Sequence, residues 1–481
     1  MMKREVVVGF VWNSLNLLVS KGASLLFVLF LARLLSPETF GLIAMIAICF
    51  ELGNVFVRSG LQQAIIRSKE IRPIDLDSAF YANIALSLLA YLLLFTVAPH
   101  IAGFYERPEL KGLIEVAGLV VCINSLKIVQ MAILSRAMNF KALMFANSTS
   151  TVVGGVGALV LAYAAYGVWS LVAQMLVMSI VSTAILWKLS EWRPTASFSL
   201  DSVKTLMRFG DKLLVEGILL VISRNSYIVV IGSVFSAEVA GLYFFSRRLQ
   251  QVISQQLTGA VQQTTYPFLS TLQDDNEELK NRYRQIGQIL MFATGAVMVT
   301  VATVAESLFS LFLDPRWQDA AMYLQLLCIL GLMYPLHAMN INILSVKGRT
   351  DLILSIGMLK KAVTLAILFL SIPFGVLGII VGQIIGSLLC LVPNTYYSVK
   401  LINYGVKEQL VDVLKPTIAA AITYVCVAVV QKLTDQNDFI ELFVTMFAVF
   451  VCYMVTNLVF KTDGLLLLWK QVRQRNWLVK L

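Results

Sequence analysis

Long apolar runs, separated by short polar segments, follow one another along almost the whole chain. Each run is close to the roughly 20 residues that an α-helix needs to cross ~30 Å of hydrocarbon. The runs are continuous rather than alternating in polarity, which favours transmembrane helices over the strands of a β-barrel. The fourteen predicted spans cover 8–34, 39–64, 78–104, 113–134, 142–164, 167–189, 206–234, 238–266, 286–313, 318–344, 352–372, 374–399, 410–432 and 439–460.

The composition agrees with an all-α membrane protein of about 14 transmembrane helices. Hydrophobic residues make up 58% of the 481 residues and charged residues 14%, whereas soluble chains have about 45–50% and about 25%. This excess of apolar residues excludes a soluble enzyme, a secreted disulfide scaffold and a receptor with a large external domain. The first span is not a cleaved signal peptide, because its apolar run continues through Leu35 without a small-residue cleavage site.

Basic residues in the loops predict the orientation. With the N-terminus in the cytoplasm, 24 Lys and Arg residues fall on the inner side and four on the outer side. The inner set includes Lys280, Arg282 and Arg284, in the loop before the ninth span. This asymmetry is a strong positive-inside signal, and it explains most of the net charge of +10 without a nucleic-acid partner. The basic segment 463–481 is expected to lie on the inner membrane face as a cytoplasmic amphipathic tail.

Cysteine and histidine give no sign of a metal site or a cofactor. All six cysteines lie inside apolar runs, without a CxxC pair, and buried cysteine behaves as a small hydrophobic residue. The two histidines, His100 and His337, are too far apart to suggest metal ligation. We therefore expect no metal ion and no cofactor.

The two halves of the chain resemble each other at an offset of 200 residues. The segment 36–42 (SPETFGL) matches 236–242 (SAEVAGL), and Gln62-Gln63 matches Gln262-Gln263 without a gap. Six of the 28 positions from 36 to 63 are identical. Locally the motif is typical of a helix start, with Ser36 as N-cap, Pro37 at the first helical position and Glu38 near the positive helix end.

The repeat predicts how the helices are organised. Six spans separate the copies, so both halves have the same orientation, as in transporters built by parallel duplication around a central substrate cavity. We expect an N-lobe over 1–200, a C-lobe over 201–404, two additional helices over 405–462, and the tail over 463–481.

Ten basic residues lie within or at the edges of the predicted spans. The acids in comparable positions are fewer: Glu51, Asp211, Glu216 and Glu306. The basic residues are Lys21, Arg33, Arg58, Lys127, Lys212, Arg224, Arg247, Arg248, Lys360 and Lys361. A charge in the middle of a span, such as that of Lys21, costs at least ~2.5–3.5 kcal/mol.

Two interpretations of these charges remain open. In the first interpretation, the charged residues form ion pairs within the bundle, Glu51 with Arg58 or Glu216 with Arg224. Four acids, however, cannot neutralise ten cations. The surplus favours a water-filled cationic cavity for an anion, particularly phosphate or pyrophosphate, which the Arg fork binds through two parallel hydrogen bonds.

The candidate site residues follow from the second interpretation. Glu51, Glu216 and Glu306 are candidates for proton or Na⁺ coupling, a role that the sequence does not separate from structural pairing. The predicted residues for pyrophosphate and sugar are Lys21, Arg58, Arg224, Arg247, Arg248, Lys360, Gln62 and Gln262.

Several helix-end motifs resemble those of bacterial Wzx-type polysaccharide flippases, with the closest likeness to the colanic-acid-type branch. The motifs are the segments 9–14 (GFVWNS) and 31–42 (LARLLSPETFGL), Tyr266-Pro267-Phe268 with 272–275 (LQDD), and Arg316-Trp317 with 324–328 (LQLLC). The likeness extends from about residue 5 to 400. These flippases belong to the multidrug/oligosaccharidyl-lipid/polysaccharide exporter superfamily.

The resemblance implies a fold and a substrate. It implies two six-helix lobes around a V-shaped cavity, working by alternating access in the bacterial cytoplasmic membrane, with both termini in the cytoplasm. The implied substrate is an undecaprenyl-pyrophosphate-linked oligosaccharide for exopolysaccharide, O-antigen or capsule biosynthesis. The implied partners are membrane lipids and the polymerase and glycosyltransferases of the pathway. Many relatives have twelve spans, so the last two spans are the less secure part of the topology.

Three alternatives remain at this point. A lipid II flippase of the cell wall would share the anionic substrate and the number of spans. A cation or drug antiporter of the same superfamily would need acidic rather than cationic cavity residues. A membrane polysaccharide polymerase would need an external catalytic segment, and the longest outer loop spans only about Pro99–Gly112. We therefore expect a transporter and not an enzyme.

Overall fold

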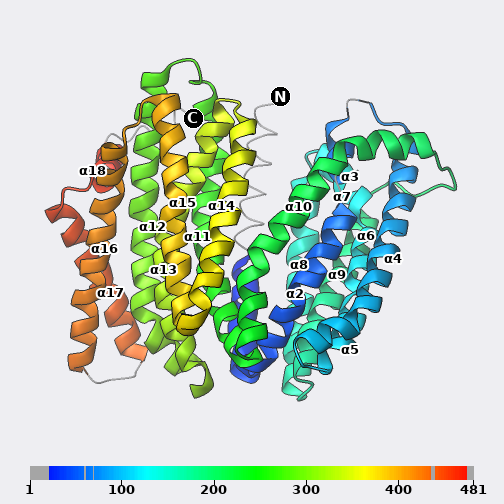
Figure 1. The fold of residues 1–481 in the computed structure, drawn as a ribbon, viewed down its shortest axis with the longest axis horizontal. Helices are drawn as coiled ribbons and strands as arrows, with labels where there is room; N and C mark the ends of the chain where they lie inside the picture. Colours follow the sequence, from blue (N-terminus) through cyan, green and yellow to red (C-terminus); the bar gives the residue numbers. More distant parts are fainter. Residues whose placement is uncertain (1–20, 59–60, 69, 435–438, 474–481) are drawn as a thin grey trace. The chain divides into compact units, whose positions relative to one another are not determined.

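The computed structural model describes residues 21–58, 61–68, 70–434 and 439–473, and the regular structure in these ranges is entirely helical. The all-α architecture predicted from the sequence is therefore confirmed. Contacts divide the chain into two compact units, Met1–Phe244 and Phe245–Leu481, whose helices are labelled in Figure 1.

Helices of the first unit begin at residue 21. Residues 21–34 are helical, followed by α2 (Pro37–Arg58), α3 (Leu61–Arg67), α4 (Pro73–Phe104), α5 (Glu109–Ala117), α6 (Leu119–Ser125), α7 (Ile128–Arg136), α8 (Phe140–Tyr163), α9 (Val168–Leu189) and α10 (Leu200–Val234). Helix α11 (Ala237–Ser270) crosses from the first unit into the second. Helix α10 packs against α2, α3 and α4, so its contacts group it with the first unit. The division of the repeat into lobes at residue 200 stays a prediction.

The second unit continues with seven further α-helices in its described part. They are α12 (Asn276–Phe312), α13 (Gln318–Val346), α14 (Thr350–Ser371), α15 (Gly375–Ile402), α16 (Val406–Thr434), α17 (Phe439–Val459) and α18 (Asp463–Arg473). Short 3-10 helices, η1 (Pro315–Trp317) and η2 (Ile372–Phe374), precede α13 and α15. Helix α18 begins the predicted tail, whose last eight residues lie outside the described residues.

The described parts of the fourteen predicted spans lie largely on these helices. Ten helical stretches of the described chain are long and apolar enough to cross a membrane, or eleven if the bent pair Glu109–Ser125 and Ile128–Arg136 is one span. One of these stretches, Asp351–Ile402, contains both α14 and α15. Residues 8–20 of the first predicted span lie outside the described residues.

The fourth span was predicted as continuous, which is wrong. It is divided into α5, α6 and α7, with a bend of 40° between α6 and α7. Side chains from neighbouring helices bind the carbonyl groups that the break leaves free: Asn83 donates to the Ser125 oxygen at 3.2 Å, and Trp187 to the Leu126 oxygen at 2.7 Å. Because hydrocarbon offers no water to such groups, these two side chains make the break tolerable inside a membrane.

The prediction that an inner loop precedes the ninth span is also wrong. Helix α12 begins at Asn276, ten residues before the apolar run, so Lys280, Arg282 and Arg284 lie on a helix. Asp275 caps this extension by accepting hydrogen bonds from the backbone of Glu277 and Glu278 at 3.1 and 3.0 Å. Hydropathy identifies the part of a helix that hydrocarbon covers and misses such a polar extension.

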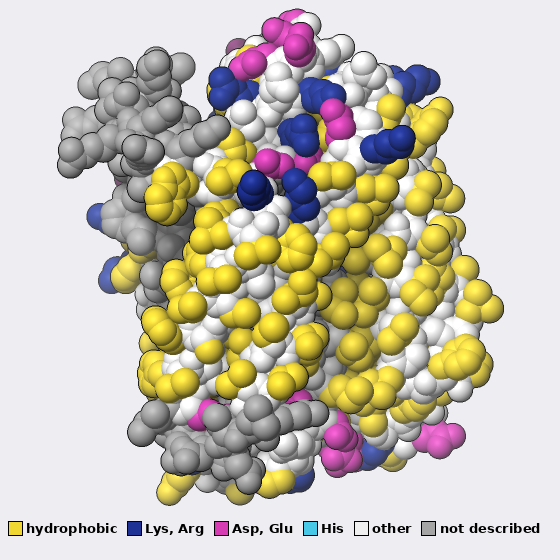
Figure 2. Space-filling view, turned by 90° about the vertical axis from the view of Figure 1, so that its left-hand side faces the viewer, with side chains coloured by type: hydrophobic (Ala, Val, Ile, Leu, Met, Phe, Trp, Pro, Cys, Tyr) yellow, Lys and Arg dark blue, Asp and Glu magenta, His cyan; other side chains and the backbone are white. Residues whose placement is uncertain are grey.

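An apolar band crosses one face of the C-terminal helices. Figure 2 shows hydrophobic side chains across the middle of the face that α16 and α17 form, with Lys and Arg gathered at one end. Phe443, Phe447 and Val429 are each more than half exposed within this part of the chain. Such a surface in contact with water would be a large unfavourable apolar patch, so it fits a lipid-facing belt.

The two copies of the sequence repeat contact each other directly. In both copies the serine is an N-cap: Ser36 accepts a hydrogen bond from the Thr39 amide at 3.3 Å, and Ser236 from the Val239 amide at 3.2 Å. The helix-start interpretation of the motif is therefore confirmed.

Glycine makes this contact possible. A Cβ atom on Gly41 would lie 1.6 Å from the Ala237 oxygen, and one on Gly241 would lie 1.8 Å from the Pro37 oxygen. Each glycine thus contacts the second residue of the other copy, as a two-fold relation between the copies requires. Any larger side chain at either position would force the backbones of α2 and α11 apart.

We predict that Gly41→Ala destabilises the protein by about 1–3 kcal/mol, because the methyl group overpacks a backbone contact. Thermal unfolding of the purified protein in detergent measures the change. Gly157→Ala is the matched control: a Cβ there meets nothing within 4 Å, so the better helix propensity of alanine should leave stability equal or slightly higher. Equal unfolding temperatures for Gly41→Ala and the wild type would contradict the close contact.

Candidate functional site

A hydrogen-bonded pair lies between α2 and α10 in the first unit. The Asn225 amide donates to the Glu51 carboxylate at 2.9 Å and also to the Val221 carbonyl at 2.9 Å. Asn225 is only 5% exposed. Its amide therefore holds the Glu51 carboxylate at the helix interface, next to the turn of α10 that carries Arg224.

A second polar pair lies one turn along α2. Asn124, on α6, donates to the Asn54 side-chain oxygen at 3.0 Å. The side-chain oxygen of Asn124 is itself buried and accepts no hydrogen bond from the described residues. Lys127, directly after α6, donates to the Ser182 hydroxyl of α9 at 2.6 Å. The broken fourth span thus brings an amide and an ammonium group into the interior of the first unit.

The predicted cations of the first unit lie on different elements. Lys21 is exposed on the helix 21–34, and Arg224 is exposed on α10. Arg58 ends α2, and its side chain lies outside the described residues. Gln62 is half-buried on α3. The structure therefore distributes these residues over four helices of one unit.

The remaining predicted binding residues belong to the second unit. Arg247 is half-buried and Arg248 exposed, both on α11. Lys360 is half-buried on α14. Gln262 already donates to the Ala338 carbonyl of α13 at 2.9 Å, so its amide takes part in packing. A common cavity for the two sets stays a prediction.

The three candidate coupling acids differ in their surroundings. Glu51 is half-buried and accepts from Asn225. Glu306 is exposed on α12 and accepts from the Gln325 amide at 3.1 Å. Glu216 is exposed on α10. Glu51 therefore has the most enclosed carboxylate of the three.

Sequence reasoning overlooked the asparagines of the interior. Asn54, Asn124, Asn225, Asn340 and Asn394 all lie inside apolar runs, and all take part in hydrogen bonds between side chains. An asparagine inside an apolar run is visible in the sequence, and its amide needs a hydrogen-bond partner within the membrane. Attention to charge alone left these residues out.

Comparison with known proteins assigns the family. Residues 30–322 match a family model described as "Polysaccharide biosynthesis protein". The chain belongs to this family. It is 23% identical over 393 residues to the Escherichia coli lipopolysaccharide biosynthesis protein WzxC, a match covering 80% of this chain and 77% of WzxC. It is 27% identical over 318 residues to the Rhizobium meliloti succinoglycan biosynthesis transport protein ExoT, covering 66% and 64%.

Solved structures show the fold. An inward closed structure of the lipid II flippase MurJ matches with a TM-score of 0.76 at 14% identity, covering 94% of this chain and 98% of MurJ. An inward-facing multidrug transporter of the MATE family matches with a TM-score of 0.61 at 17% identity, covering 80% and 94%. The resemblance to polysaccharide flippases and the transporter fold expected from the sequence are confirmed, and the protein is a multi-pass membrane protein.

We predict that Asn225→Leu destabilises the protein by about 1–3 kcal/mol, because it leaves the enclosed Glu51 carboxylate without its donor. Replacing both partners by leucine should recover most of this loss, since no polar group then remains unpaired. Thermal unfolding of the single and double variants measures both effects. A single variant as stable as the wild type would show that the bond contributes nothing.

Proposed function

We propose that this protein flips an undecaprenyl-pyrophosphate-linked oligosaccharide from the inner to the outer leaflet of the bacterial cytoplasmic membrane, as a step in exopolysaccharide, O-antigen or capsule biosynthesis. The observation that carries the proposal is the match of a transporter fold to a polysaccharide biosynthesis family. The relatives WzxC and ExoT are described as proteins of polysaccharide biosynthesis, ExoT as a transport protein. Transport is therefore the proposed activity, rather than catalysis.

Cationic side chains would compensate the charge of the substrate during such transport. An isolated ion transferred into hydrocarbon costs tens of kcal/mol by Born estimates, so a pyrophosphate needs compensating charge on its way. In the proposed mechanism Lys21, Arg58 and Arg224 of the first unit supply this charge. Arg247, Arg248 and Lys360 of the second unit supply the rest. Gln62 faces the sugars, and Gln262 does so after exchanging its bond to the Ala338 carbonyl for one to a sugar hydroxyl.

Alternating access completes the mechanism. The lipid tail stays in the bilayer while relative motion of the two halves exposes the headgroup to one side and then to the other. We place both termini in the cytoplasm. An inside-negative membrane potential favours export of the anion by ~2.3 kcal/mol per charge per 100 mV. Glu51, whose carboxylate is the most enclosed, is the first candidate for ion coupling.

We predict that Lys21→Gln and Arg224→Gln each lower the flux of lipid-linked oligosaccharide by about 10- to 100-fold, because each removes a charge-assisted contact with pyrophosphate. Flux is measured in proteoliposomes that contain equal amounts of folded protein. Lys21→Arg, which keeps the charge, is the control and should retain most of the flux. Unchanged flux in both glutamine variants would refute the cationic site.

A lipid II flippase is the second candidate, because the structural match to MurJ covers nearly the whole of both chains. The two functions predict different phenotypes. Depletion of a polysaccharide flippase removes surface polymer from growing cells, whereas depletion of the cell-wall flippase lyses them. We expect loss of polymer without lysis, and proteoliposomes that move the oligosaccharide lipid without lengthening its glycan. Longer glycan products would indicate a polymerase instead.

A further inference from the structure

Two ion pairs join α12 to α16 near the starts of both helices. Lys280 pairs with Glu408 at 2.8 Å, and Arg284 pairs with Asp412 at 2.5 Å. The residues on each helix are four apart and so lie on one face, one turn from each other. The first pair is the more exposed, whereas the Asp412 side chain is only 5% exposed. Of the four side chains, only that of Asp412 is buried.

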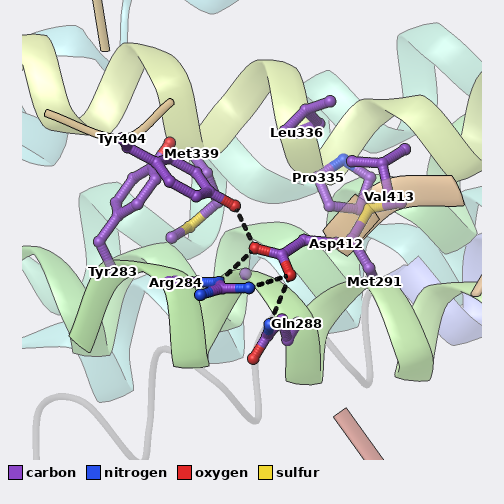
Figure 3. A pocket seen from close by; sticks show the side chains of 11 residues that line it. Tyr283, Arg284, Gln288, Met291, Pro335, Leu336, Met339, Tyr404, Asp412 and Val413 are labelled. Carbon is purple, nitrogen blue, oxygen red and sulfur yellow. Dashed lines mark hydrogen bonds and ion pairs between the residues drawn. The ribbon is translucent and has the colours of Figure 1, made fainter. Parts of the chain in front are cut away.

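Asp412 receives hydrogen bonds from three directions, shown in Figure 3. Arg284 donates through two nitrogens at 2.5 and 2.8 Å, Gln288 donates at 2.7 Å, and the Tyr404 hydroxyl donates at 2.6 Å. Burial, and then the carboxylate beside it, raise the pKa of Tyr404. Its hydroxyl hence remains protonated at neutral pH and can donate to Asp412.

The C-terminal helices rest on α12 at the same place. Gln288 also donates to Asp463, the first residue of α18, at 3.3 Å. Gly464 follows, and a Cβ atom there would lie 2.4 Å from the Gln288 carbonyl oxygen. Further along α12, the Tyr453 hydroxyl of α17 donates to the Phe292 carbonyl at 2.9 Å. Helices α16, α17 and α18 therefore dock specifically on one face of α12.

Tyr404 lies in the turn that connects α15 to α16. Asn403 adopts a left-handed conformation there, with φ of 57°, and the Gln409 side chain donates to the Tyr404 carbonyl at 2.8 Å. The Tyr404 ring packs edge to face on the ring of Tyr283, on α12, with the ring centroids 5.9 Å apart. The turn is thus fixed from both sides, by Asp412 and by Tyr283.

Polar contacts continue from Tyr283 into the unit. The Tyr283 hydroxyl and the Ser398 hydroxyl both donate to the Asn340 side-chain oxygen, at 3.0 and 2.8 Å. One turn deeper on α13, the His337 ring contacts the Ser387 hydroxyl at 2.9 Å and the Asn394 amide at 3.4 Å. These contacts set the register between α13 and α15.

Lys360 packs on the same stretch of α15. Cys390, which lies between Ser387 and Asn394 in the sequence, donates from its thiol to the Lys360 carbonyl at 3.9 Å. The helix that carries Lys360 is therefore seated on the part of α15 that His337 and Asn340 hold in place.

We propose that Asp412 is a positioning residue for flipping: through Tyr404 and Tyr283 it fixes α13 and α15, and with them the turn of α14 that carries Lys360. This inference rests on the proposed function, in which Lys360 binds pyrophosphate. It also gives a role to α16, α17 and α18. Helix α16 supplies the carboxylate, and α17 and α18 pack on α12 beside it.

Three variants of the full-length protein test the inference. Tyr404→Phe removes one bond to Asp412 and keeps the ring, and Asp412→Asn removes the charge at nearly equal volume. Glu408→Gln is the matched control, because it removes the corresponding charge from the exposed pair one turn away. Amide hydrogen exchange is followed in segments 337–342 and 390–402, and the dissociation constant for undecaprenyl pyrophosphate is measured in parallel.

We expect Tyr404→Phe to raise exchange in both segments by about 3- to 10-fold, the effect of one lost hydrogen bond. Asp412→Asn should raise it further, and Glu408→Gln should leave it unchanged. The dissociation constant should rise for the first two variants only, while the rest of the chain keeps its wild-type exchange. A general loss of folding would instead raise exchange everywhere.

Wild-type exchange in both segments of Tyr404→Phe and Asp412→Asn would overturn the proposal, as would equal effects of Glu408→Gln. Faster exchange with an unchanged dissociation constant would overturn the link to Lys360. If the wild-type protein fails to bind undecaprenyl pyrophosphate, the proposed function fails, and the exchange experiment still decides whether Asp412 positions α13 and α15.

Discussion

Hydrocarbon offers no hydrogen bonds, so every polar group that the chain carries into a membrane has to find its partner within the protein. The break in the fourth span shows the consequence most directly. Its free carbonyls are tolerated because Asn83 and Trp187 reach them from α4 and α9. The same requirement explains why the Asn225 amide lies against Glu51 and the Asn124 amide against Asn54, and why Asp412 lies where three donors converge.

Close packing of the repeats depends on a second, steric constraint. Helices α2 and α11 begin with the same motif, and the two motifs meet with backbone against backbone at Gly41 and Gly241. A duplicated sequence brings the same small residue to both sides of the contact. The repeat therefore has a structural role, because its identical glycines form the contact between the copies.

Charge is distributed according to what surrounds it. At the ends of α12 and α16, Lys280 and Arg284 have acidic partners, of which the buried one is fully hydrogen-bonded. Within the first unit, Lys127 is held by a serine hydroxyl and Glu51 by an amide.

By itself the sequence determined the all-helical membrane fold, the positions of the spans, the repeat and the family resemblance, because hydrophobic length and helix-end motifs are local properties. It also pointed to Glu51, although not to Asn225, which holds it. Only the tertiary structure decided where a span breaks, that α12 extends ten residues beyond its apolar run, and that Asp412 joins α12 to α16. The break and the contacts of Asp412 depend on partners 40 or more residues away, which a periodic pattern along one helix cannot reveal. The extension of α12 is polar, so the hydropathy of the chain does not show it.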